Sequence, residues 1–149
     1  MNEFFGTIYD TVFGIFANKY FLIFQHLYEN GGYVKFGLSF ILIPLVFWIL
    51  FYYLWKYPYG KLWHWLVWLA VTVLVVLGAT YGIANTEIYS SDNQALNEAL
   101  ADASTGYADY ASALPLKYAL ANSLLALIIS IIYSLIMKQF SKIQLHLPF

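Results

Sequence analysis

The chain lacks cysteine and arginine, and it is poor in charge of either sign. Without cysteine it has no disulfide bond, no thiolate metal site and no cysteine nucleophile. All seven basic residues are lysines, so there is no guanidinium group to hold a phosphate or carboxylate by two parallel hydrogen bonds. The net charge of −1 and the scattered lysines argue against nucleic acid as a partner.

Charged residues make up only 10% of the 149 residues, whereas 62% are hydrophobic. A soluble domain carries about 25% charged residues because its surface must be wetted. Three long apolar runs cover residues 36–55, 62–84 and 118–137. A helix of about 20 residues crosses the hydrocarbon core of a bilayer, so each run is long enough to span it. The sequence therefore predicts an all-α integral membrane protein with three transmembrane helices, forming a single membrane domain over residues 1–149.

Residues 4–28 predict an amphipathic helix before the first span. At 100° per residue its broad side is aromatic and aliphatic, and its narrow side carries a polar stripe that includes Asp10, Thr11, Asn18 and Gln25. Such a helix either lies in the membrane interface or crosses as a fourth span. An ionised residue at the centre of a spanning helix costs roughly 2.5–3.5 kcal/mol, so Asp10 and Lys19 favour the interfacial arrangement.

The connections between the spans differ in length and charge. Residues 56–61 form a tight turn between the first two spans, and residues 85–117 form an acidic loop before the third. A short helix capped by Ser90 or Ser91 is expected inside that loop, and Pro115 suits the first turn of the last span.

Lysine placement predicts the orientation. Lys56 and Lys61 lie in the short loop, and Lys138 and Lys142 follow the third span, whereas the long loop is mainly acidic. Because lysines near the ends of spans stay in the cytoplasm, the 56–61 loop and the C-terminus are expected there, with the 85–117 loop outside. The lysine-only basic set fits an AT-rich genome, and we expect a bacterial inner membrane.

Small residues in the second and third spans predict close helix packing. Gly78 and Gly82 form a G-x-x-x-G pattern, and a stripe of small residues follows the third span: Ala119, Ser123, Ala126, Ser130 and Ser134. In lipid, small side chains let helix backbones approach closely and gain dispersion and hydrogen bonds. These faces are expected to pack within the chain or against another chain.

Tryptophans cluster where the second span begins. Indole rings favour the headgroup level, so these residues are expected to form an interfacial girdle: Trp55, Trp63, Trp65 and Trp68. His64 lies among them and could instead ligate haem. A second histidine would have to face it, but His26 lies near the opposite membrane face and His146 lies in the tail. We therefore expect a girdle, without metal or cofactor.

No catalytic combination of residues can be assembled from the sequence, so the protein is not expected to be an enzyme. The preferred hypothesis is a non-catalytic polytopic subunit of a multi-protein or homo-oligomeric membrane assembly. Its partners would be the lipid bilayer and other membrane-protein chains, contacted through the small-residue faces and the external loop. The alternative is a homo-oligomeric ion channel or membrane-permeabilising effector lined by the polar stripe. A channel requires Asp10, Asn18 and Gln25 to cross the bilayer and converge.

Overall fold

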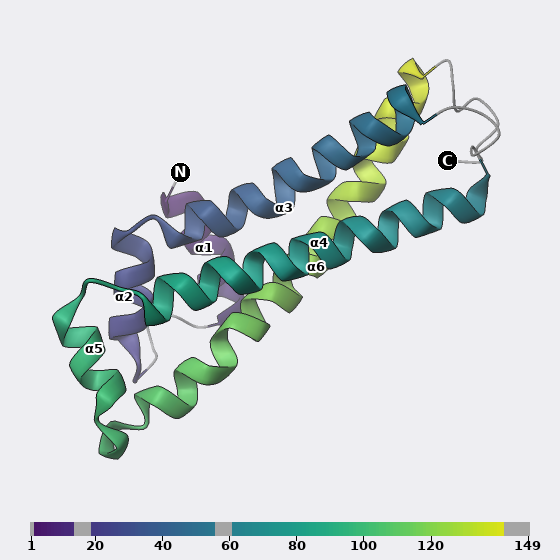
Figure 1. Ribbon diagram of the computed structural model, residues 1–149. Helices are drawn as coiled ribbons and strands as arrows, with labels where there is room; N and C mark the ends of the chain where they lie inside the picture. The colour runs from purple at the N-terminus through teal and green to yellow at the C-terminus, as the bar shows by residue number, and fades with distance from the viewer. Residues whose placement is uncertain (1, 14–18, 56–60, 142–149) are drawn as a thin grey trace. The chain divides into compact units, whose positions relative to one another are not determined.

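A computed structural model describes residues 2–13, 19–55 and 61–141, and every secondary-structure element in these ranges is helical (Figure 1). This confirms the predicted all-helical class. The elements in chain order are α1 (Asn2–Phe13), α2 (Phe21–Glu29), α3 (Gly32–Ile49), the π-helical turn η2 (Leu50–Leu54), α4 (Leu62–Tyr89), α5 (Gln94–Ala101), the 3-10 turn η3 (Ala103–Thr105) and α6 (Tyr107–Phe140).

Within the described residues, three helices are long and apolar enough to cross a membrane, as predicted. They comprise Gly32–Leu54 with 23 residues, Leu62–Tyr89 with 28 and Tyr107–Phe140 with 34. Each exceeds its apolar run, because helical hydrogen bonding continues where the side chains become polar. α4, for example, includes Asn85, Thr86 and Glu87, and the Ser90 backbone N–H donates to the Thr86 carbonyl at 2.9 Å. A 28-residue helix rises about 42 Å, which matches a bilayer with its headgroup layers.

The connection between α4 and α6 is shorter than the predicted loop of residues 85–117. It covers only residues 90–106, because α4 extends to Tyr89 and α6 begins at Tyr107. The expected place of Pro115 in the first turn is wrong, since Pro115 lies well inside α6. Gly106 precedes this helix with a φ of 73°, a left-handed conformation that glycine adopts without strain.

The helix expected within this connection is α5, but its cap differs from the prediction. The side chain of Asn93, rather than Ser90 or Ser91, accepts a hydrogen bond from the Leu96 backbone N–H at 3.2 Å. The carboxylate of Asp102 then accepts from the hydroxyl of Ser104 at 2.7 Å and from its backbone N–H at 2.9 Å. These two hydrogen bonds lower the pKa of Asp102, because they stabilise the charged carboxylate.

The single helix predicted over residues 4–28 is instead two helices. Lys19 and Tyr20 form a turn, and Tyr20 has φ −97° and ψ 38°, so the chain is not helical through this point. Stacking of the Tyr20 ring on Tyr110, with the centroids 4.3 Å apart, holds that turn. The 12 residues of α1 rise about 18 Å and the nine of α2 about 14 Å, both short of the roughly 30 Å hydrocarbon core.

The chain divides into two compact units. The first comprises Met1–Gly37 and Ala79–Ala119, and the second comprises Leu38–Gly78 and Leu120–Phe149. The boundary passes through α3, α4 and α6, so each unit contains parts of all three long helices.

The cores of the two units differ in their aromatic side chains. The first unit buries rings of tyrosine and phenylalanine, namely Phe5, Tyr9, Phe24, Tyr33, Phe36 and Tyr118. The second buries Trp48, Phe51, Tyr52 and Trp65 as one cluster. All five tryptophans of the chain belong to the second unit.

Candidate functional site

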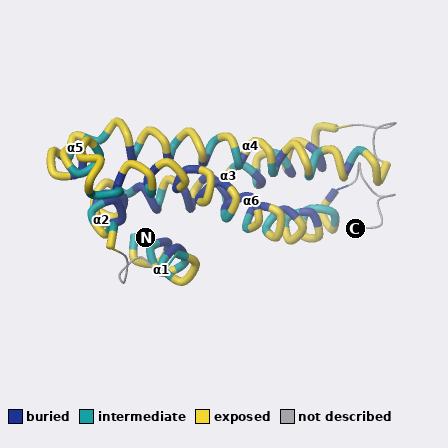
Figure 2. The backbone as a smooth tube through the Cα atoms, turned by 90° about the horizontal axis from the view of Figure 1, so that it is seen from below, coloured by how far each residue is buried: buried dark blue, intermediate teal, exposed yellow. Residues whose placement is uncertain are grey.

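The small-residue stripe of α6 faces the interior of the chain. Four of its five members lie in the second unit and Ala119 lies in the first, and all five are buried: Ala119, Ser123, Ala126, Ser130 and Ser134. Figure 2 shows this alternation of buried and exposed positions along α6. Large side chains such as Leu124, 67% exposed, and Ile128, 55% exposed, lie on the outer side. The stripe therefore packs within the chain and is not free for an external partner.

Hydrogen bonds connect the buried side of α6 to α3, η2 and α4 inside the second unit. The indole Nε1 of Trp65 donates to the Ser134 hydroxyl at 2.7 Å, and the Tyr52 hydroxyl lies 2.7 Å from the same oxygen. Nearer the middle of α6, the Asn122 amide donates to the Ser39 hydroxyl at 3.3 Å. These bonds satisfy polar groups that would otherwise be costly to bury.

The Gly78 and Gly82 positions of α4 are in a different situation. Both glycines are exposed, and a Cβ atom placed on either would meet nothing within 4 Å among the described residues. The helix as a whole is also the least covered of the three: 17% of its most apolar window is buried, compared with 39% for α3–η2 and 28% for α6. This small-residue face is therefore open within the described chain.

The four tryptophans of the expected girdle have different surroundings. Trp63 is 70% exposed and Trp55 is 37% exposed, whereas Trp65 is 7% exposed and belongs to the core. Trp68 packs against this core and, with Trp55, Trp63 and His64, lines an apolar hollow of about 420 Å³. Trp48, which lies outside the predicted girdle, is 1% exposed.

The polar stripe of residues 4–28 is divided between two helices. Asp10 and Thr11 lie on α1 and Gln25 lies on α2, while Asn18 falls outside the described residues. The Thr11 hydroxyl donates to the Thr7 carbonyl at 2.8 Å, and the Gln25 amide donates to Glu29 at 2.8 Å. Thr11 and Gln25 therefore do not form a ladder along one continuous helix, which is the arrangement assumed for a channel.

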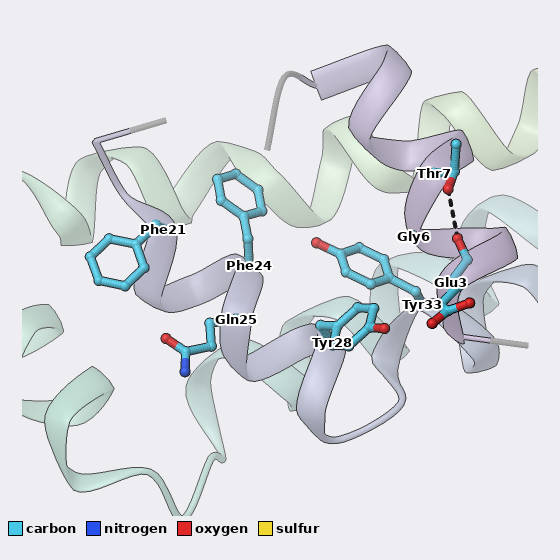
Figure 3. A pocket seen from close by; sticks show the side chains of 8 residues that line it. All are labelled: Glu3, Gly6, Thr7, Phe21, Phe24, Gln25, Tyr28 and Tyr33. Carbon is cyan, nitrogen blue, oxygen red and sulfur yellow. Dashed lines mark hydrogen bonds between the residues drawn. The ribbon is translucent and has the colours of Figure 1, made fainter. Parts of the chain in front are cut away.

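A pocket of about 610 Å³ lies in the first unit, where α1 and α2 meet the start of α3. Its lining consists of Glu3, Gly6, Thr7, Phe21, Phe24, Gln25, Tyr28 and Tyr33 (Figure 3). Four residues of α2 contribute at the spacing 21, 24, 25 and 28, which is one face of a helix. This spacing can be recognised in the sequence. The opposite side of the pocket is formed by α1, whose place beside α2 depends on the turn at Lys19 and Tyr20.

Buried tyrosines lie beside this pocket. The Tyr9 and Tyr33 rings stack with centroids 5.4 Å apart, and the hydroxyls of Tyr33 and Tyr118 lie 3.4 Å apart. At the same end of the unit the Lys35 ammonium pairs with the Glu87 carboxylate at 2.6 Å. Together these contacts tie α1, α3, α4 and α6 within the first unit, and Tyr33 is the residue that they share with the lining of the pocket.

Ligands for a metal ion do not cluster in the part of the chain that the structure describes. His26 is buried, and its Nε2 lies 3.1 Å from the Asn30 amide nitrogen. Comparison of the chain with protein-family models, curated proteins and solved structures gives no match. The function must therefore be inferred from the faces and the pocket described above.

Proposed function

We propose that the protein is a non-catalytic polytopic subunit of a membrane assembly and that it docks on a partner span through the Gly78 and Gly82 face of α4. The observation that carries the proposal is that this face is open while the other small-residue stripe, on α6, is packed within the chain. The partner is either a second copy of this chain or a different membrane protein.

The presence of glycine on this face supports a helix partner over lipid. A glycine inside a helix costs about 1 kcal/mol relative to alanine, and lipid tails make better contact with large side chains. Elsewhere on the long helices the exposed positions are mostly leucine, isoleucine and valine. Close approach of another backbone compensates for the missing side chains, as in other G-x-x-x-G contacts.

The arrangement in the membrane completes the proposal. The 56–61 loop and the C-terminus are cytoplasmic and the segment between α4 and α6 is external, in a bacterial inner membrane. The short helices α1 and α2 lie at the external interface rather than forming a fourth span, since neither is long enough to cross. Exposed acids between α4 and α6, among them Asp92 and Glu98, offer a second contact for a partner.

The test compares Gly78→Leu and Gly82→Leu with the matched control Ala70→Leu. Ala70 is also exposed on α4, but it is turned about 80° from Gly78 around the helix axis. Each tagged chain is extracted from its host in mild detergent, and its assembly is measured by native mass spectrometry. We expect the wild type and Ala70→Leu to carry other chains and both glycine variants to lose them, while all remain inserted.

A wild-type chain that is always monomeric would overturn the proposal, as would glycine variants that assemble normally. A closed ring of this chain alone that conducts ions across a bilayer would instead support the channel alternative.

A further inference from the structure

We propose that the pocket between α1 and α2 binds a quaternary ammonium group, carried by an amphiphile of the surrounding membrane. The pocket is separate from the α4 face, and the proposal does not depend on assembly. It rests on the ring content of the walls, the charge of the lining and the position of the pocket in the chain.

Four of the eight lining residues carry aromatic rings. Phe24 and Tyr33 are each 1% exposed, whereas Phe21 and Tyr28 are 54% and 38% exposed. In Figure 3, Tyr28 and Tyr33 lie between the labelled residues of α1 and the remainder of α2. Alkylated ammonium groups are bound by such groups of rings because the negative face of each ring attracts the cation.

The charge of the lining selects a cation. Glu3 is the one ionisable carboxylate among the lining residues, and the lining contains no lysine or histidine. The Thr7 hydroxyl donates its hydrogen to the Glu3 carbonyl at 2.8 Å, so its free lone pairs act as acceptors. One N–H of Gln25 is likewise taken by Glu29. An anion would therefore find few donors here, whereas a cation finds a carboxylate and several π faces.

The ring content also favours an alkylated ammonium over a primary one. A primary ammonium carries three N–H donors that each need an acceptor, and the two phenylalanines of the wall provide none. A quaternary ammonium has no N–H donors, so contact with rings leaves no hydrogen bond unmade. The volume of about 610 Å³ lies within the range of small-molecule sites, which is about 300–1,000 Å³.

The position of the pocket indicates an amphiphile. Tyr33 lies in the first turn of the long apolar span Gly32–Leu54. The end of a spanning helix lies at the level of the lipid headgroups. A headgroup in the pocket would leave its alkyl chain free to follow the apolar surface of that helix.

The experiment uses the full chain, purified in a maltoside detergent and titrated with dodecyltrimethylammonium. Binding is followed by native mass spectrometry, and dodecyl sulfate at the same low concentration is the anionic comparison. We expect saturable binding of one cationic amphiphile per chain and no comparable binding of the sulfate. Glu3→Gln and Tyr28→Leu should each weaken binding roughly three- to thirtyfold.

Asp109→Asn is the matched control, because Asp109 is an exposed acid in the first turn of α6 that does not line the pocket. It should bind like the wild type. Both tested side chains are exposed, so circular dichroism should show unchanged helix content in all variants. Competition by tetramethylammonium would show that a free quaternary ammonium ion also binds in the pocket. If tetramethylammonium does not compete, the site is specific for a membrane amphiphile that carries this group. Equal binding of both charges, or full affinity in Glu3→Gln, would overturn the proposal.

Discussion

At the residue scale, Ser134 of α6 joins two other elements of the second unit through its hydroxyl. Its hydroxyl is hydrogen-bonded to the Trp65 indole and to the Tyr52 hydroxyl, each at 2.7 Å. The Tyr52 carbonyl in turn accepts from the Ser141 hydroxyl at 2.7 Å. The Ser134 hydroxyl therefore joins two side chains, one from η2 and one from α4, to α6, and Ser141 adds a separate contact between η2 and the residue after α6.

Ser134→Ala should destabilise the protein by about 1–2 kcal/mol, because it leaves the Trp65 N–H and the Tyr52 hydroxyl without this partner. The measurement is unfolding in mixed detergent micelles, followed by circular dichroism. Ser130→Ala is the matched control: Ser130 is buried on the same stripe, but its hydroxyl has no hydrogen-bond partner among the described residues. It should be close to neutral, and equal losses in both variants would contradict the role assigned to Ser134.

The sequence predicts the small residues of this stripe but not their partners. Trp63 and Trp65 are both tryptophans in the first turn of α4, yet one is exposed and the other is in the core. In a soluble protein a polar face would distinguish the outer side of the helix. Lipid tails and a protein core are both apolar, so hydropathy carries no such contrast within a span.

At the element scale, the docking of α1 depends on a glycine of α3. The Phe5 ring packs so closely on Gly37 that a Cβ atom at this position would collide with it. Phe5 itself is 4% exposed. Contact of an aromatic ring with a bare backbone therefore helps to hold the N-terminal helix of the first unit.

Gly37→Ala should displace Phe5 and loosen α1, at a cost of about 1–3 kcal/mol. Hydrogen exchange of the α1 amides, read by mass spectrometry, measures the loosening directly. In Gly82→Ala the new methyl group meets open space, so the chain should be unchanged or stabilised by about 0.5–1 kcal/mol. Protection of α1 in Gly37→Ala as strong as in the wild type would show that Phe5 has room to move.

The three long helices could be predicted from their apolar runs, because length and composition decide whether a helix can span a bilayer. Their ends could not, since α4 and α6 continue through polar residues. The sequence does not predict the break near Tyr20 either, because that break depends on residues distant in the chain. The Tyr20 ring contacts Tyr107 and Tyr110, and the Tyr107 hydroxyl donates to the carbonyl of Lys19, which is 88 positions earlier. Without that break the pocket between α1 and α2 has no second wall.

At the scale of the whole molecule, the orientation in the membrane is open to direct measurement. The absence of cysteine allows single cysteines to be added without removing any. Ala101 at the end of α5 and Gln139 in the last turn of α6 are both exposed. They lie on opposite sides of the bilayer in the arrangement that we propose.

In intact spheroplasts, Ala101→Cys should react with a membrane-impermeant maleimide, and Gln139→Cys should react only after permeabilisation. The reason is the concentration of lysines at the proposed cytoplasmic side, where Lys61 and Lys138 lie. Gel shift of the labelled chain provides the measurement. The reverse pattern of labelling would mean that the lysine distribution does not govern this chain.

The unequal distribution of indole rings has a consequence for how unfolding is observed. Because all five tryptophans belong to the second unit, their emission spectrum reports solvent entry into that unit alone. The first unit could lose its tyrosine core while the fluorescence curve stayed flat. Emission and far-ultraviolet dichroism would then give different midpoints, and their difference would show whether the two units melt as one.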